Sequence, residues 1–220
     1  MDFSRASLPD GALPLACLIL AGALCYDWRR IDWRALAFGP GLNRLGATSV
    51  CLMVFWHMSA RLGPGFGLHI LGVTAAVLML GRGQALLALA IASLGAAIAK
   101  GSDLAAWPFD FTLLALMPAW FADAANRWIQ RRLPHHFFIF VFVNTCLVAA
   151  LGVLLVGLGA TATLGLAGHS WQALFEDYLP YFLLLAFAES WMCGVAITLL
   201  VVYRPGWVAA FDDQSYLMDK

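Results

Sequence analysis

The sequence predicts an all-α membrane protein, a bundle of about seven transmembrane helices. Of its 220 residues, 62% are hydrophobic and only 12% are charged, whereas soluble domains average about 25% charged residues. The mean hydropathy is +0.81, and a chain this apolar has more apolar surface than a soluble fold can bury. Because one span takes about 20 residues, seven spans use nearly the whole chain, and we expect a single transmembrane domain over residues 1–220.

Seven apolar runs give the expected spans. They cover residues 12–26, 45–60, 66–80, 84–99, 111–128, 137–158 and 178–203. The third and fourth are separated only by Gly81-Arg82-Gly83, which predicts a tight helical hairpin. The first and third are short for a span. Each is therefore tilted, lengthened by neighbouring residues, or partly re-entrant.

The charged residues predict the orientation of the bundle. Residues 27–43 alternate arginines with apolar and aromatic residues, a pattern typical of a helix lying along the membrane interface. Residues 204–220 begin with Arg204-Pro205, which ends the last span, and we expect a short solvated tail, with a docking segment as the alternative. One set of connections collects ten of the 13 basic residues: Arg29, Arg30, Arg34, Arg44, Arg82, Arg127, Arg131, Arg132, Arg204 and Lys220. This positive-inside bias predicts an N-terminus outside and a C-terminus in the cytoplasm, in a multi-pass protein of the cell (inner) membrane.

Polar residues within the spans are the first candidates for function, because they must be paired or hydrated there. Glu189 lies near the middle of the last span. It is either a protonated group bonded to a neighbouring helix or a group that handles a substrate, proton or ion, and both interpretations stay open. Asn144 in the sixth span predicts an interhelical hydrogen bond. Asp123 near the end of the fifth predicts an interfacial ion pair with Arg127.

Histidines and sulfur-containing residues gather around the connection between the second and third spans. His57 and His69 flank that connection on the predicted outer side, which they share with Asp10. Met53 lies one helical turn from His57, and a Cys and a Met lie two turns apart on a neighbouring stripe. Imidazole and sulfur ligands suit a transition metal, and sulfur favours copper(I); apolar packing is the alternative. The candidate metal ligands are His69, His57, Asp10, Met58, Met53 and Cys51.

Several function classes have no support in the sequence. The formal net charge is zero, so no basic surface predicts a nucleic-acid partner. We find no nucleophile elbow, phosphate-binding glycine loop or closely spaced pair of acids. We therefore expect the lipid bilayer as the surroundings of this chain and no enzymatic activity of its own.

Three fragments carry a resemblance to a known family. Leu8-Pro9-Asp10-Gly11 is similar to an N-terminal His-Ile-Pro-Asp-Gly. The stretch GLHIL and the hairpin after it are similar to a third helix that contains Gly-His-Leu. AESWMCGV and the closing RPGWV are similar to a last helix that contains Gly-Glu-Ala and ends in Arg-Pro. Together they resemble the CbiM/NikM family, the membrane substrate-binding subunits of energy-coupling-factor (ECF) cobalt and nickel importers. The resemblance places Asp10, His69 and Glu189 at matching positions.

The resemblance implies uptake of a transition-metal ion (Co, Ni or Cu) from outside, together with ECF-type transmembrane and ATPase subunits. In that family the N-terminal amine and the His after Met1 bind the metal with the third-helix His. Here Ser7 stands at the position of that first His, so the family's clamp cannot form in the same manner. We expect His69 to be joined by replacements, with His57, Met58 and Asp10 as candidates. The alternative function is a non-transporting metal-binding or metalloenzyme-assembly factor, possibly for copper, that serves a metalloprotein client.

Overall fold

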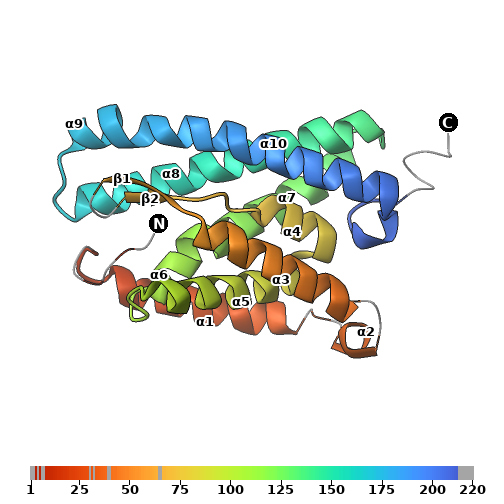
Figure 1. Cartoon of the computed structure of the whole chain (residues 1–220), viewed down its shortest axis with the longest axis horizontal. Coiled ribbons are helices and arrows are strands. Elements are labelled where there is room, and N and C mark those ends of the chain that lie inside the picture. The colour runs from red at the N-terminus through yellow and green to blue at the C-terminus, as the bar shows by residue number, and fades with distance from the viewer. Residues whose placement is uncertain are drawn as a thin grey trace.

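The computed structural model describes residues 3, 5, 8–29, 31, 33–38, 41–63 and 66–212 and shows a bundle of long helices (Figure 1). The elements in chain order are α1 (Ala12–Trp28), α2 (Trp33–Phe38), α3 (Gly41–His57), β1 (Ala60–Gly63), β2 (Phe66–Leu68), α4 (Val73–Leu80), α5 (Arg82–Lys100), α6 (Trp107–Phe111), η2 (Thr112–Leu116), α7 (Met117–Arg132), η3 (Ile139–Leu147), α8 (Val148–Leu166), α9 (Trp171–Ala173), η4 (Leu174–Tyr178), α10 (Leu179–Tyr203) and η5 (Pro205–Trp207). The segments η2, η3 and η4 are π-helical turns inside longer helices.

Two of the π-helical segments have a local cause in the sequence. Pro118 follows η2 and Pro180 follows η4, each two residues past the end of the π-helical segment. A proline has no backbone N–H to donate to the preceding turn, so the regular hydrogen-bond ladder cannot continue through it. The wider turn keeps each helix continuous across the proline.

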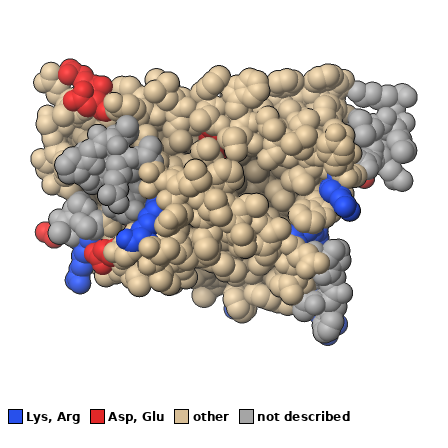
Figure 2. Space-filling view, viewed as in Figure 1, with Lys and Arg blue, Asp and Glu red and all other residues tan. Residues whose placement is uncertain are grey.

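The middle of the molecule is suited to the hydrocarbon core of a membrane. Among the described residues, three helices are long and apolar enough to cross it, Arg82–Lys100, Ile139–Leu166 and Trp171–Tyr203, and α1 is a shorter apolar helix. In the face shown in Figure 2, charged side chains gather towards the two ends, and the band between them is uncharged apart from one small acidic spot. The predicted all-α membrane fold is confirmed.

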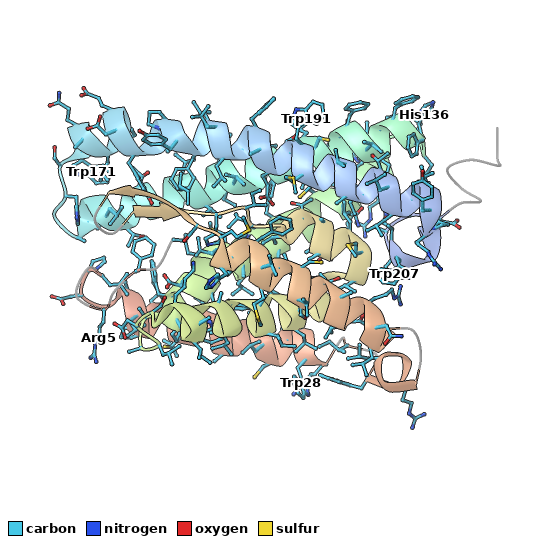
Figure 3. All side chains as sticks on the ribbon, viewed as in Figure 1. Arg5, Trp28, His136, Trp171, Trp191 and Trp207 are labelled. Carbon is cyan, nitrogen blue, oxygen red and sulfur yellow. The ribbon has the colours of Figure 1, made fainter. Side chains whose placement is uncertain are left out.

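Aromatic side chains mark the two ends of the bundle. Figure 3 places Arg5 and Trp171 at one end and Trp28 and Trp207 towards the other. The rings of Trp28 and Trp33 lie 4.4 Å apart where α1 turns into α2, as expected for an interfacial segment. Following the predicted orientation, we call the end that holds β1, β2 and α9 the outer end and the end that holds α2 the inner end.

The third predicted span, residues 66–80, is wrong as a continuous helix. Its first residues form β2, which pairs antiparallel with β1 as a short hairpin. Residues 69–72 are not helical, and α4 then runs for only 8 residues. Gly72 has a φ of 66°. This left-handed conformation prevents α4 from continuing before residue 73. The chain still passes from the hairpin at the outer end to Arg82 near the inner end, so the neighbouring non-helical residues complete the crossing and the segment is not re-entrant.

The chain after the last span also differs from the expected solvated tail. The backbone N–H groups of Ala209 and Ala210 donate to the carbonyl oxygens of Met79 and Leu78, at 3.1 and 3.0 Å. Phe211 is buried against the same part of the bundle. These bonds satisfy the free carbonyl groups at the C-terminus of α4. Residues 204–212 are thus a docked segment, and the remaining tail, residues 213–220, lies outside the described residues.

A buried ion-pair cluster joins three helices near the inner end. Arg82 lies at the start of α5, with Nη2 2.7 Å from Asp27 Oδ1 of α1 and Nη1 2.6 Å from Asp123 Oδ2 of α7. Its guanidinium group lies over the ring of Trp120. The predicted pair of Asp123 with Arg127 is confirmed at 2.5 Å. Asp27 and Arg82 extend it into a cluster that the sequence did not indicate.

Candidate metal centre

The non-helical segment 69–72 is the centre of the candidate site, and Glu189 holds it in place. Glu189 Oε2 accepts a hydrogen bond from the backbone N–H of Leu71 at 2.7 Å, and Oε1 accepts one from that of Gly72 at 2.6 Å. The Trp56 indole N–H donates to the carbonyl of Leu71 at 2.9 Å. Non-helical backbone at membrane depth is tolerated only where its polar groups are satisfied by the protein. Glu189 and Trp56 together supply that satisfaction.

The surroundings of Glu189 explain why a carboxyl group is buried there. Its side chain is 1% exposed and lies at the N-terminus of α4, where the unpaired N–H groups carry partial positive charge. Cys193, one turn further along α10, has its Sγ 3.5 Å from Glu189 Oε1. Both carboxyl oxygens act as acceptors towards backbone N–H groups. Glu189 is therefore bonded to the backbone at the N-terminus of a neighbouring helix, α4.

His69 lies in a small enclosed cavity on the outer side of this segment. Its side chain is buried, and its ring centroid is 4.8 Å from that of Trp56. His69 Nδ1 is 3.2 Å from the carbonyl oxygen of Ile70. A carbonyl can only accept, so Nδ1 carries the proton and Nε2 keeps a lone pair for a metal ion. The cavity of about 20 Å³ is lined in part by Trp56, His69, Ser93, Lys100, Trp107 and Asp110, and it has room for about one water molecule or ion.

Asp110 is the cavity residue that the sequence analysis missed. It lies in the first turn of α6, and its Oδ1 accepts a hydrogen bond from the backbone N–H of Phe3 at 3.2 Å. Asp103 similarly accepts from the backbone N–H of Arg5 at 2.9 Å. These two acids anchor the N-terminal segment beside the His69 cavity. The sequence did contain a signal for Asp110, because it is a carboxyl group inside the apolar stretch WPFDFTLLAL. A charged residue in such a stretch is a candidate for function, as Glu189 was.

The other predicted outer ligands do not line this cavity. His57 is the exposed last residue of α3, Met58 follows it at 69% exposure, and Asp10 is exposed in the turn before α1. Within the described part of the chain, no group of three or more His, Cys, Asp or Glu side chains lies close enough to hold a metal ion. The structure therefore does not bring His57 and Asp10 to His69. Ser7 lies outside the described residues.

The remaining candidates occupy three separate places. Met53 is half-buried and its side chain fills the space over Gly95 of α5, as packing residues do. Cys51 lines a second, larger cavity. Asn144 is fully buried, and its Nδ2 donates to Asn126 Oδ1 at 2.7 Å. The expected interhelical hydrogen bond is thus present, between η3 and α7.

Comparisons with known proteins agree with this architecture. A family model, CbiM, described as the cobalt uptake substrate-specific transmembrane region, matches residues 7–207. A solved structure titled as a truncated transition metal transporter superposes with a TM-score of 0.77 at 14% identity, covering 92% of this chain and 99% of that chain. A second, titled as a transition metal transporter, gives 0.75 at 14% identity over 91% and 92%. No curated protein matches. At this identity the two structures show a shared fold.

Proposed function

The chain belongs to the CbiM family of cobalt uptake substrate-specific transmembrane regions, and we propose that it binds Co(II) in the cavity shared by His69 and Asp110. It is a membrane subunit for uptake of a transition-metal ion, and the family match does not favour the alternative of an assembly factor. Nickel is the second candidate, because the same nitrogen and oxygen donors suit both ions.

One observation carries the proposal: an imidazole nitrogen with a lone pair and a carboxylate line the same cavity of single-ion size at the outer end. The contact between Nδ1 and the Ile70 carbonyl orients the His69 ring, as a partner of the second nitrogen does in metal sites. Asp110 supplies negative charge that offsets the lost hydration of a divalent cation. The bonds from Glu189 and Trp56 to Leu71 fix the backbone directly after His69.

The cavity also contains a group that opposes a cation. Lys100, the last residue of α5, lines it together with Asp110. The positive charge of Lys100 repels a Co(II) ion in this cavity and lowers its affinity. Neutralising Lys100 is therefore expected to tighten Co(II) binding, whereas neutralising Asp110 weakens it. This opposite response is specific to an ion bound between the two groups.

We further propose that uptake requires ECF-type partner subunits in the inner membrane. The sequence has no phosphate-binding glycine loop, so ATP hydrolysis has to come from another chain. The resemblance to CbiM/NikM subunits implies a transmembrane partner and an ATPase. Uptake of labelled cobalt by cells carrying this chain, with and without candidate partner genes, tests this part separately from binding.

The binding proposal is tested on protein purified without chelators, by Co(II) titration and elemental analysis. His69→Ala and Asp110→Asn are each expected to weaken Co(II) binding at least about tenfold, since a ligand matters no less than the groups that orient it. His57→Ala is the matched control and is expected to bind like wild type. Equal Co(II) content in the wild type and His69→Ala would overturn the proposal.

A further inference from the structure

A second cavity, of about 280 Å³, lies over α4 and between α3 and α10. Its lining is almost entirely apolar and extends from Ile70 and Gly72 to Trp207, which Figure 3 places towards the inner end. The volume is roughly twice that of an engineered cavity that binds benzene. The cavity therefore suits a hydrocarbon chain segment of about ten carbons.

Arg44 lies at the inner rim of this cavity. It precedes Ala47 and Thr48, which line the cavity, by one helical turn of α3, and residues at this spacing share one face of a helix. Arg44 Nη1 donates to the carbonyl oxygen of Gly206 at 2.9 Å, and the next residue, Trp207, also lines the cavity. The guanidinium group is thus held beside the cavity at its inner end.

The positive charge of Arg44 has no counter-charge among the described residues. Its side chain is half-buried, makes no ion pair with them, and bonds only to Gly206. Its Nε is buried without a hydrogen-bond partner in this part of the chain. Arg204, exposed at the end of α10 on the opposite wall, likewise pairs with no described acid. A half-buried charge is costly unless an opposite charge offsets it, so we expect an anion at this rim.

We propose that this cavity binds an anionic phospholipid of the inner leaflet, with part of an acyl chain in the cavity and the phosphate group at Arg44 and Arg204. Guanidinium groups bind phosphate oxygens through parallel N–H donors. The Trp207 ring then lies at the level of the headgroup, where tryptophans are enriched in membrane proteins. This lipid site goes beyond the Co(II) site and shares none of its proposed ligands.

The lipid contacts the same backbone segment that carries His69. Ile70 and Gly72 line the lipid cavity, whereas His69 lines the outer cavity. The acyl chain therefore packs against segment 69–72 without entering the metal cavity. A ligand that binds only the folded protein stabilises it by mass action, so the lipid is expected to raise the unfolding temperature.

The test uses delipidated protein in detergent, with native mass spectrometry and thermal unfolding as readouts. The probes are dioleoyl phosphatidylglycerol, dioleoyl phosphatidylcholine and inorganic phosphate. Phosphatidylglycerol is expected to bind at least about fivefold more tightly than phosphatidylcholine, whose choline offsets the phosphate charge, and to raise the unfolding temperature. Phosphate alone is expected to leave that temperature unchanged. Equal binding of the two lipids, or equal stabilisation by phosphate, would overturn the proposal.

Arg44→Gln tests the headgroup contact. It removes one cationic group at the membrane surface and is expected to weaken phosphatidylglycerol binding about fivefold. Arg29→Gln, at an exposed arginine that ends α1 and does not line the cavity, is the matched control and is expected to bind like wild type. Equal lipid affinity in these two variants would contradict the proposed headgroup site. His69→Ala is expected to keep lipid binding and Arg44→Gln to keep Co(II) binding, so the two proposals can fail separately.

Ala196→Phe tests the acyl-chain contact without changing any charge. Ala196 lines the cavity from α10, and a phenyl ring there occupies space that the chain needs. Phosphatidylglycerol binding is expected to weaken at least about tenfold, the contribution of two buried methylene groups. Val195→Phe, at the exposed neighbouring position outside this cavity, is the control. Unfolding temperatures without lipid show that both variants fold, and unchanged lipid binding in folded Ala196→Phe would overturn the proposal.

Discussion

Replacing Glu189 with Gln measures how much the buried carboxylate contributes to holding segment 69–72. The carboxylate accepts backbone N–H groups at 2.7 and 2.6 Å, and hydrogen bonds to a charged group contribute about 1.5–3 kcal/mol each. Gln offers one acceptor oxygen, and its NH₂ group faces the second N–H. One backbone donor is then left unsatisfied and the other bond loses its charge. We expect a loss of about 3 kcal/mol in the free energy of unfolding.

The assay is thermal unfolding in detergent together with Co(II) affinity. For a chain of 220 residues, about 3 kcal/mol corresponds to a fall of about 6–12 °C in the unfolding temperature. If the same free energy is lost from the ordered state of segment 69–72, Co(II) binding weakens by up to about 100-fold. The cause of this weakening is the misplaced backbone after His69.

The matched control is Glu176→Gln, the same substitution at an exposed acid of η4 that contacts Gln172 of the adjacent turn. It is expected to leave the unfolding temperature and the Co(II) affinity unchanged. If Glu189→Gln has the same unfolding temperature as the control and binds Co(II) like wild type, the carboxylate does not hold the segment. That result would refute our account of the site.

Three further outcomes follow from the structure. The hydrogen bond from the Arg5 backbone lowers the pKa of Asp103, so its stabilising contribution is present at neutral pH and lost as the pH falls through that lowered pKa. The difference in unfolding temperature between wild type and Asp103→Asn should therefore shrink as the pH is lowered below the usual pKa of an aspartate. Arg82→Gln leaves the buried carboxylate of Asp27 without its cation and should cost about 3–5 kcal/mol. A wild-type unfolding temperature would contradict the described cluster. Gly72→Ala places a Cβ 2.6 Å from Leu52 Cδ2 at a positive φ and should lower the free energy of unfolding by more than about 1 kcal/mol. In Gly22→Ala the added Cβ meets no neighbouring atom, so thermal unfolding of this control should show no loss of stability.

Hydropathy predicted the membrane class and most helices because spans are long, apolar and locally encoded. It failed at residues 66–72, since an apolar extended segment and an apolar helix have the same hydropathy. The non-helical backbone at Leu71 is held by Glu189, 118 residues away in the sequence. The docking of Ala209 and Ala210 on α4 is equally remote. Neither contact leaves a periodic pattern in the sequence.

The candidate site was predicted in part. His69 stood out as a histidine beside an apolar run, and it does lie in a buried cavity at the outer end. His57 shares the same connection but ends exposed at the tip of α3, because the strand hairpin separates the two. Asp110 was overlooked because it lies one residue before the predicted fifth span. Which residues share a cavity depends on how distant helices pack, and that information is not local.

The short helix α4 is attached at both ends to the same neighbour. Its N-terminus is held by Glu189 of α10, and its C-terminus by the backbone of Ala209 and Ala210 that follows α10. A rod fixed at two points cannot pivot on its own, so any displacement of α4 must carry α10 with it. The arginine cluster makes α1, α5 and α7 a second coupled group. Because α4 also packs against α5 and α7 of that second group, a movement of α4 would be transmitted to both groups.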